Sequence, residues 1–267
     1  MKKYGFIGLG SQGAPMARRM IEAGLPTVLW ARRPDSLQPF ADTAAERADS
    51  LEALAAEVDY VALCVVSNDD VVEVCGRLMP HMRPGSHVVI HSTIHPDVCI
   101  SLAAEACRRG LRLVDAPVSG GAPAAEQGTL TVMLGAEEDD VAAVRPVLAT
   151  FATMITHLGA VGAGQRAKLI NNTMLTANIA IAHYGLEAAA HLGLERDAFI
   201  DLVRASSGHS RGFDVSARMS EPAAFAHGAA MLQKDVGLLG EALGQQPAFK
   251  VLSEAAQSFL KLVPPRS

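Results

Sequence analysis

The sequence has few cysteines, and their arrangement indicates neither a metal site nor a disulfide framework. None of the four forms a CxxC pair, and none has a histidine at zinc-finger spacing; they are Cys64, Cys75, Cys99 and Cys107. Structural zinc sites and small disulfide-bonded domains depend on such closely spaced residues. We therefore expect no metal centre, and the cysteine usage fits a reducing compartment such as the cytoplasm.

Long apolar runs and an excess of basic residues are also missing. The longest clean apolar run covers 60–66, far short of the roughly twenty residues that span a bilayer. Lys2 and Lys3 precede an apolar stretch that glycines interrupt within a few residues, unlike a secretory signal peptide. The formal net charge is −5, whereas nucleic acids and anionic membranes attract basic surfaces. We expect neither as a partner.

The pattern of hydrophobic residues indicates two domains. Residues 3 to about 155 alternate amphipathic stretches with short β-branched runs, namely KYGFIGLG, TVLWA, VDYVALCVV, SHVVIHS and LRLVDAPV. This rhythm predicts an α/β domain with a doubly wound, mostly parallel sheet. From Gly164 to Leu192 the pattern becomes one long helical run, and helical segments continue to the end. We therefore expect an α/β domain over 1–161 and an all-α domain over 162–267, which begins with a long interdomain helix.

A glycine-rich turn, GLGSQG, follows the first predicted strand and directly precedes a helix. In this context Gly8 permits the tight turn, Gly10 lets a pyrophosphate approach the backbone, and Gly13 allows close packing of helix and strand. The phosphates would then lie at the helix N-terminus. The turn predicts a dinucleotide-binding domain of the Rossmann type, whose cofactor-binding residues are Gly8, Leu9, Gly10, Ser11, Gln12 and Gly13.

The end of the second predicted strand bears on the choice of cofactor. It reads WARRP, where an NAD-binding domain of this type normally carries an acid that binds the ribose. Arg32 and Arg33 offer guanidinium groups to a ribose 2′-phosphate, and no carboxylate follows until Asp35. The pattern favours NADP, with NAD as the alternative, because two surface arginines can also merely solvate a loop.

Four motifs, in order, resemble those of the β-hydroxyacid dehydrogenase family. GFIGLGSQGAPMA is similar to its cofactor fingerprint, DAPVSGGAPAAEQGTLTVMLG at 115–135 to its substrate motif, GAGQRAKLINN at 162–172 to its catalytic motif, and LQKDVGL at 232–238 to its late cofactor motif. The family includes 3-hydroxyisobutyrate dehydrogenase, tartronate semialdehyde reductase and glyoxylate/succinic semialdehyde reductase, with 6-phosphogluconate dehydrogenase more remote. The resemblance implies an NAD(P)-dependent oxidoreductase that interconverts a small β-hydroxy acid and its semialdehyde or keto acid by hydride transfer.

The substrate and catalytic motifs contain residues with suitable chemistry. The Ser119 hydroxyl and the amides of Gly120 and Gly121 can bind an anionic group such as a substrate carboxylate, since the glycines have no side chains in the way. Lys168 and Asn172 are four residues apart on a predicted helix and so share a face. The resemblance implies that Lys168 is the general acid/base and that Asn172 helps to hold the substrate.

Other site residues follow from the resemblance alone. A lysine serves as a base where burial or nearby positive charge favours its neutral form, and Lys234 can supply such charge. The family pattern places Lys234 near the nicotinamide end of the cofactor, with Asp235 beside it as a substrate-binding residue. It also implies cofactor contacts from Val65, Val66, Asp70 and Thr93. A threonine or aspartate at such positions is also commonly a helix cap.

Two other functions remain open at this stage, and both are disfavoured by Lys168. Imine reductases share the architecture but generally lack this lysine, and non-catalytic NADPH-binding modules of similar fold usually lose it and carry basic extensions. The chain departs from the family pattern at Gln12, where a methionine is usual, and over 211–234, which is shorter than in typical members. The resemblance implies a homodimer or homotetramer and a small anionic substrate, but it does not identify that substrate.

Overall fold

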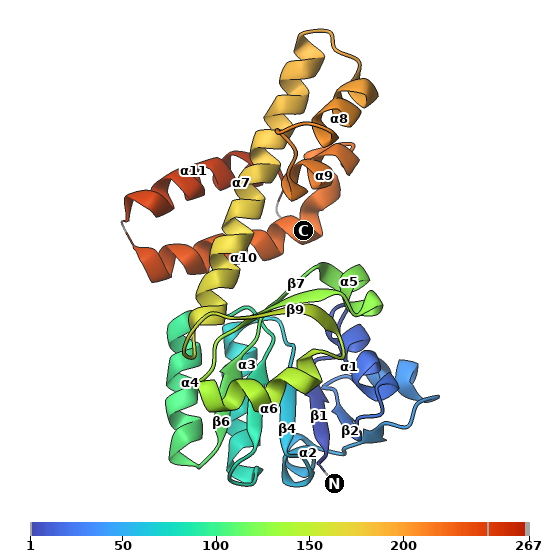
Figure 1. The fold of residues 1–267 in the computed structure, drawn as a ribbon, viewed down its shortest axis with the longest axis vertical. Helices are drawn as coiled ribbons and strands as arrows, with labels where there is room; N and C mark the ends of the chain where they lie inside the picture. Colours follow the sequence, from blue (N-terminus) through green and yellow to red (C-terminus); the bar gives the residue numbers. More distant parts are fainter. Residues whose placement is uncertain (1, 245, 265–267) are drawn as a thin grey trace. The chain divides into compact units, whose positions relative to one another are not determined.

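The computed structural model describes residues 2–244 and 246–264, which form two compact units. The first unit is Met1–Lys168 and the second is Leu169–Ser267, so the division falls within a long helix, α7 (Ala163–His191) (Figure 1). Among the described residues, no helix combines the length and the apolar character that crossing a membrane requires.

The first unit is built around a six-stranded, wholly parallel sheet in the order β3-β2-β1-β4-β5-β6. Its strands are β1 (Tyr4–Ile7), β2 (Thr27–Trp30), β3 (Glu46–Arg47), β4 (Tyr60–Leu63), β5 (His87–Ile90) and β6 (Arg112–Asp115). The strand order reverses direction from β1, as in doubly wound folds, in which the carboxyl ends of the strands beside this switch carry the ligand. The sequence prediction of an α/β Rossmann domain is confirmed.

Apolar side chains point alternately to the two faces of this sheet, so each face has its own buried cluster. Phe6, Leu29 and Ala62 belong to one buried cluster, which includes the inner face of α1 (Gly13–Glu22). Their neighbours Ile7 and Val28 belong to the other, against α2 (Leu51–Glu57), α3 (Asn68–Leu78) and α4 (Pro96–Arg108). Because successive side chains of a strand point to opposite faces, the near-continuous apolar runs in the sequence correspond to strands buried on both sides.

A second, smaller sheet in the first unit was not predicted. Its strands β7 (Val118–Ser119), β8 (Leu130–Leu134) and β9 (Ala152–His157) pair antiparallel and then parallel. The connecting helices are α5 (Gly121–Gln127) and α6 (Glu138–Leu148). An isolated bridge between Asp115 and Gly135 links the end of β6 to the end of β8. This sheet presents the SGG segment of the substrate motif at the turn between β7 and α5.

Helix boundaries in the first unit follow local signals in the sequence. Gly24, just beyond the end of α1, adopts a left-handed φ of 78°, as expected of a glycine that ends a helix. The Ser50 side chain caps α2 by accepting from the Ala53 amide, and serine is among the residues preferred at this position. At the start of α3, Ser67 and Asp70 form a capping box.

The second unit is helical, as predicted. It contains most of α7, followed by α8 (Arg196–Arg204), α9 (Arg211–Arg218), a short 3-10 helix (Pro222–Phe225), α10 (Ala226–Leu243) and α11 (Pro247–Leu260). One buried cluster joins Ile179 of α7 to Val236 of α10 and Phe259 of α11. A second joins Leu186 of α7 to Ile200 of α8 and Phe213 of α9. The long helix is therefore the element on which the others pack.

The start of α7 requires residues without side chains. A Cβ atom at Gly164 would lie 2.2 Å from the Met133 carbonyl oxygen and 2.9 Å from Asp115 Oδ2, so β8 and the helix would have to separate. At Gly185, on the same helix, a Cβ atom would meet nothing within 4 Å.

We expect Gly164→Ala to destabilise the protein by about 1–3 kcal/mol, the usual cost of overpacking a closed site. Gly185→Ala should instead stabilise it by about 0.5–1 kcal/mol, because alanine is the better helix former. Urea titrations followed by circular dichroism measure both changes. Equal effects of the two substitutions would contradict the close approach of α7 and β8.

Candidate functional site

The glycine-rich turn between β1 and α1 fits a dinucleotide. Gly8 has a φ of 97°, and a Cβ atom there would lie 2.2 Å from the Cys64 carbonyl oxygen. At Gly13 a Cβ atom would lie 2.0 Å from the Gly8 oxygen, whereas at the exposed Gly10 it would meet nothing within 4 Å. Two of the glycines thus close the turn, and the third leaves open space in front of the N-terminus of α1, where a pyrophosphate would approach.

The other predicted residues of this turn lie around that open space. Ser11 is exposed, Leu9 is half-buried against the core under α1, and Gln12 occupies the N-cap position without a side-chain capping hydrogen bond. The N-terminal amides of α1 are therefore not occupied by a cap from Gln12, which suits an anion-binding helix end.

The two arginines after β2 are exposed, and one of them contacts a second predicted cofactor residue. Arg32 Nη2 lies 2.8 Å from Asp70 Oδ1 and 3.6 Å from Glu73 Oε2 of α3. Hydrogen bonds from Ser67 and Arg32 hold the pKa of the Asp70 carboxyl below its usual value. Neither ion pair is predictable from local sequence, because the partners of Arg32 are about 40 positions away along the chain.

Three hydrogen bonds, to Val65 and Gln165, hold the loop that carries Thr93. Ser92 Oγ accepts from the Val65 amide at 2.8 Å, which ties the loop after β5 to the end of β4. The Gln165 side chain donates to the Ser92 carbonyl at 2.9 Å and accepts from the Ile94 amide at 3.0 Å. Thr93 lies between these two anchored residues, and Val66 is exposed after the end of β4. Ser92 and Gln165 were not among the predicted site residues.

A buried carboxylate at the end of β6 holds the first turn of α7. Asp115 is fully buried, and its Oδ1 and Oδ2 accept from the amides of Gly162 and Gln165, each at 2.7 Å. Burial raises the pKa of Asp115 to about 6, although these backbone hydrogen bonds favour its charged form. The helix that bears Lys168 therefore starts from a fixed point at the carboxyl edge of the sheet.

The substrate motif offers exposed backbone at the turn between β7 and α5. Ser119 is half-buried at the end of β7, and the exposed residues Gly120 and Gly121 have φ values of 132° and 72°. Residues with side chains rarely adopt such values, so the conformation explains why this turn uses glycine. An exposed glycine turn beside a hydroxyl group is the kind of backbone that can bind an anion.

Lys168 is the last residue of the first unit and is 92% buried, with 8% of its surface exposed. A buried lysine is uncommon, because the ammonium group loses its hydration, and it therefore points to a functional or paired group. It lies on α7 three residues after Gln165, whose side chain anchors the Thr93 loop.

Three predicted residues come together in the second unit. Asn172 of α7 donates from Nδ2 to Asp235 Oδ2 of α10 at 2.6 Å, and Lys234 Nζ lies 3.2 Å from Asp235 Oδ1. Asn172 Oδ1 also accepts from Asn171 at 3.2 Å, so hydrogen bonds fix the orientation of the amide. Asn172 and Asp235 are both buried, so their hydrogen bond holds α7 and α10 in one arrangement within the helical core.

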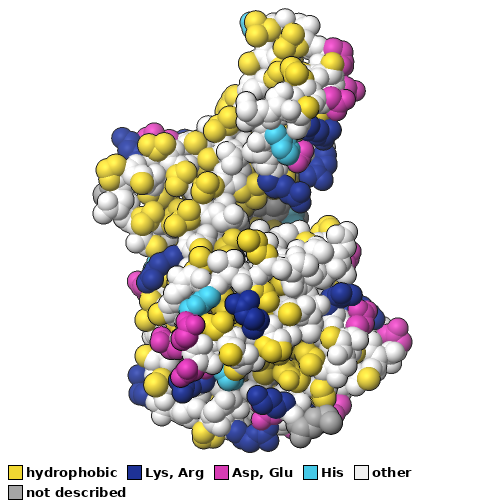
Figure 2. All heavy atoms as spheres, in the orientation of Figure 1, with side chains coloured by type: hydrophobic (Ala, Val, Ile, Leu, Met, Phe, Trp, Pro, Cys, Tyr) yellow, Lys and Arg dark blue, Asp and Glu magenta, His cyan; other side chains and the backbone are white. Residues whose placement is uncertain are grey.

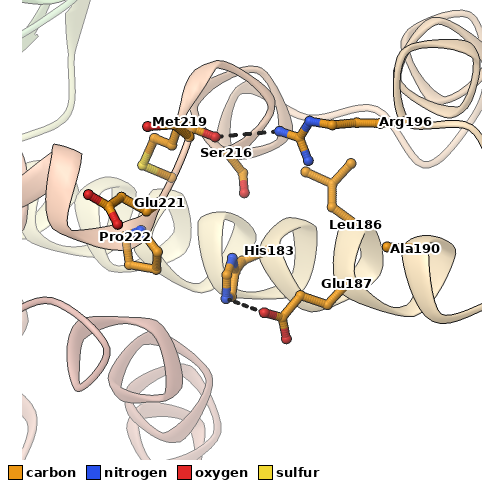
Figure 3. Close-up of a pocket in the computed structure, with 10 residues that line it drawn as sticks. His183, Leu186, Glu187, Ala190, Arg196, Ser216, Met219, Glu221 and Pro222 are labelled. Atoms are coloured by element: carbon orange, nitrogen blue, oxygen red, sulfur yellow. Dashed lines mark hydrogen bonds and ion pairs between the residues drawn. The ribbon is translucent and has the colours of Figure 1, made fainter.

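A cavity of about 260 Å³ in the second unit involves none of these residues (Figure 3). Arg196 lies at its edge and donates to the carbonyl groups of Ala217 and Met219, while His183 Nε2 lies 3.5 Å from a Glu187 oxygen. Across the described part of the chain, no three His, Cys, Asp or Glu side chains gather as they would around a metal ion.

Comparison with known protein families agrees with these features. The family described as the NAD binding domain of 6-phosphogluconate dehydrogenase matches residues 3–159. The family described as the NAD-binding region of NADP-dependent 3-hydroxyisobutyrate dehydrogenase matches residues 162–264. The two matches together span nearly the whole chain and support use of NAD or NADP.

Individual relatives point the same way. The chain is 33% identical over 249 residues to 2-(hydroxymethyl)glutarate dehydrogenase of Eubacterium barkeri, covering 90% of this chain and 82% of that protein. It is 36% identical over 178 residues to mitochondrial 3-hydroxyisobutyrate dehydrogenase of Mus musculus, covering 66% of this chain and 53% of that protein. A solved structure of Mycobacterium tuberculosis 3-hydroxyisobutyrate dehydrogenase with L-serine gives a TM-score of 0.86 at 28% identity, covering 98% and 93% of the two chains. The chain therefore belongs to the β-hydroxyacid dehydrogenase family and is an NAD(P)-dependent dehydrogenase.

Proposed function

We propose that this enzyme interconverts a small β-hydroxy acid and its semialdehyde or keto acid, that Lys168 is the general acid/base, and that NADP is the preferred cofactor. The burial of Lys168 carries the proposal, together with the fixed start of its helix beside the Thr93 loop. A surface lysine on a mobile segment would support no such role.

A nicotinamide cofactor, when bound, would supply the hydride-transfer chemistry, and the side chains of the enzyme would supply the proton. When the alcohol is oxidised, the neutral amine of Lys168 takes the hydroxyl proton; when the carbonyl is reduced, the ammonium form gives that proton back to the oxygen. The enzyme thus needs only one side chain to move the proton in both directions.

We assign the remaining predicted residues to binding and orienting the substrate and the cofactor. We assign the substrate carboxylate to the Ser119 hydroxyl and the amides of Gly120 and Gly121, whose exposed turn can surround an anion. Asn172 has one side-chain N–H beyond the one that it donates to Asp235, and this second N–H is available to a substrate oxygen. In this assignment Asp235 acts by holding the Asn172 amide in one orientation, and Lys234 contacts the cofactor.

Replacing Lys168 tests the acid–base role. We expect Lys168→Ala to lower kcat/KM by about 10²- to 10⁴-fold, the usual contribution of general acid–base catalysis, while NADPH still binds. The assay is oxidation of NADPH against glyoxylate and against succinic, tartronate and methylmalonate semialdehydes. Lys250→Ala, at an exposed lysine of α11, controls for loss of a positive charge. An undiminished rate in Lys168→Ala, or turnover of imines in place of semialdehydes, would contradict the proposal.

The proposed preference for NADP depends on whether a 2′-phosphate can compete with Asp70 and Glu73 for Arg32. The Arg32 side chain is 62% exposed and can face a 2′-phosphate, but its guanidinium group is already paired with the carboxylates of Asp70 and Glu73. A phosphate group bound there would have to displace or tolerate these carboxylates. The Arg33 side chain is exposed and has no hydrogen bond or ion pair with any described residue, so it is available as a second phosphate ligand.

Removing Arg32 and removing the charge of its partner Glu73 should change KM for NADPH in opposite directions. We expect Arg32→Ala to raise it by about tenfold or more, through loss of a charge-assisted hydrogen bond. Glu73→Gln should lower it by about 1.5- to 5-fold, since exposed ion pairs contribute about 0.2–1 kcal/mol. KM for NADH should change little in both variants, and Arg108→Ala on α4 controls for net charge. If KM for NADH shifts equally, Arg32 does not select the 2′-phosphate.

We also propose a homo-oligomer assembled through the second unit. Several large apolar side chains of this unit are exposed, and Figure 2 shows such side chains gathered over the region of α10 and α11. The exposed apolar residues of the second unit include Ile170, Met174, Ile181 and Tyr184 of α7, Met231 of α10 and Val251 of α11. Contiguous apolar surface of this kind commonly marks an interface between subunits.

Introducing a charge on this apolar surface should weaken the assembly. We expect Ile181→Asp, at a residue that is 66% exposed, to shift the protein toward monomer, with little effect on the folding of each chain. Light scattering coupled to gel filtration measures the mass. Leu202→Asp on α8, also at an exposed leucine, is the matched control. A wild-type monomer at micromolar concentration would refute the proposed oligomer.

A further inference from the structure

The Gln165 side chain connects α7 to the loop that carries Thr93. Gln165 is fully buried, and both halves of its amide are engaged: Oε1 accepts from the Ile94 amide, and Nε2 donates to the Ser92 carbonyl. The two bonds bracket Thr93 and cross more than 70 positions of the chain. Because an amide has one donor side and one acceptor side, this pairing fixes both the position and the direction of the side chain.

Further hydrogen bonds extend the connection to both sides. The Gln165 amide donates to Asp115 Oδ2, which ties the same residue to the end of β6. Ser92 Oγ accepts from the Val65 amide, which ties the loop to the end of β4. The His95 amide donates to Asn68 Oδ1 at the start of α3. One hydrogen-bond network, buried around Gln165, thus joins the carboxyl ends of β4, β5 and β6 to the first turn of α7.

We infer that Gln165 is a positioning residue, which sets Lys168 relative to the cofactor loop that contains Thr93. The inference rests on the proposed roles of Lys168 and Thr93. Lys168 follows Gln165 by three residues, so any slide or rotation of the first turn of α7 is passed to it through the rigid helix. A misplacement of about 1 Å between reacting groups can cost about 10²-fold in rate.

A purely structural role for Gln165 makes a different prediction. An apolar side chain of similar length would fill the same space, but it would leave the Ile94 amide and the Ser92 carbonyl without partners. If only packing mattered, Gln165→Met would lower stability without affecting the cofactor loop in particular. If Gln165 positions Lys168, Gln165→Met should loosen the loop that carries Thr93. It should also lower kcat by a larger factor than it weakens cofactor binding.

Gln165→Glu should remove the hydrogen bond to the Ser92 carbonyl reversibly, depending on pH. The protonated acid has one donor and one acceptor, like the amide, whereas the carboxylate cannot donate to the Ser92 carbonyl. We expect kcat/KM to be about 10- to 100-fold below wild type at pH 8 and to recover to within a few-fold of wild type near pH 5.5. Burial raises the pKa of Asp115 to about 6 in the folded chain, so both proteins are compared at the same pH.

Hydrogen exchange tests the connection without any turnover. In the protein without added cofactor, Gln165→Met should speed exchange in the segment 91–95, which contains the released Ile94 amide. The strand β5 should stay protected. Thr173→Val is the matched control, because Thr173 is fully buried on the same helix and its hydroxyl donates to the Leu169 carbonyl within α7. It should leave both exchange and kcat near wild type.

The outcomes separate this inference from the proposed function. Unchanged exchange at 91–95 in Gln165→Met, or a Gln165→Glu deficit that stays constant from pH 8 to pH 5.5, would overturn the positioning role. If Gln165→Met does not fold, Gln165→Glu still decides through its pH profile. If Lys168→Ala is as active as wild type, the proposed acid–base role fails, whereas exchange at 91–95 still reports on the connection itself.

Discussion

The geometry of the first unit depends on one buried carboxylate. Asp115 ends β6 inside a space bounded by backbone, where a Cβ atom at Gly135 would lie 2.2 Å from Oδ1 and one at Gly164 would lie 2.9 Å from Oδ2. A buried charge is costly unless it is hydrogen-bonded, and here the donors are amides from the start of α7. Because the folded-state pKa lies above the usual value, this group makes folding less favourable as the pH rises through about 6. At neutral pH the buried charge of Asp115 thus lowers the free energy of unfolding, but its hydrogen bonds fix the position at which α7 begins.

The parts of the fold that could be predicted are those with local signals. The glycines of the first turn, the alternating strands and helices, and the long run from Gly164 each reflect sterics or periodicity within a short window. The small sheet of β7, β8 and β9 was not predicted: β7 and β8 lie within the substrate motif at 115–135, whose glycines and hydroxyl group indicate chemistry more clearly than strands, and β9 lies beyond it. Strands of two residues, such as β7, have too short a pattern to recognise.

The site was predictable only in part, for a related reason. Ser92 and Gln165 act through hydrogen bonds to residues 27 to 73 positions away, and no local spacing reveals such partners. The ion pair between Arg32 and Asp70 spans 38 positions and was missed for the same reason. The contact of Asn172 with Asp235 spans 63 positions, and these two residues were named from family resemblance, not from their spacing. Chemistry that depends on tertiary contacts needs either a relative or a structure.

The three glycines of the first turn differ in what they serve. Gly8 and Gly13 are enclosed by the protein's own backbone, so the fold itself excludes any larger residue there. Gly10 faces open space, and a methyl group there would disturb no neighbouring atom of the chain. Folding and cofactor affinity therefore place separate demands on neighbouring residues, and the turn can lose its ligand without losing its shape.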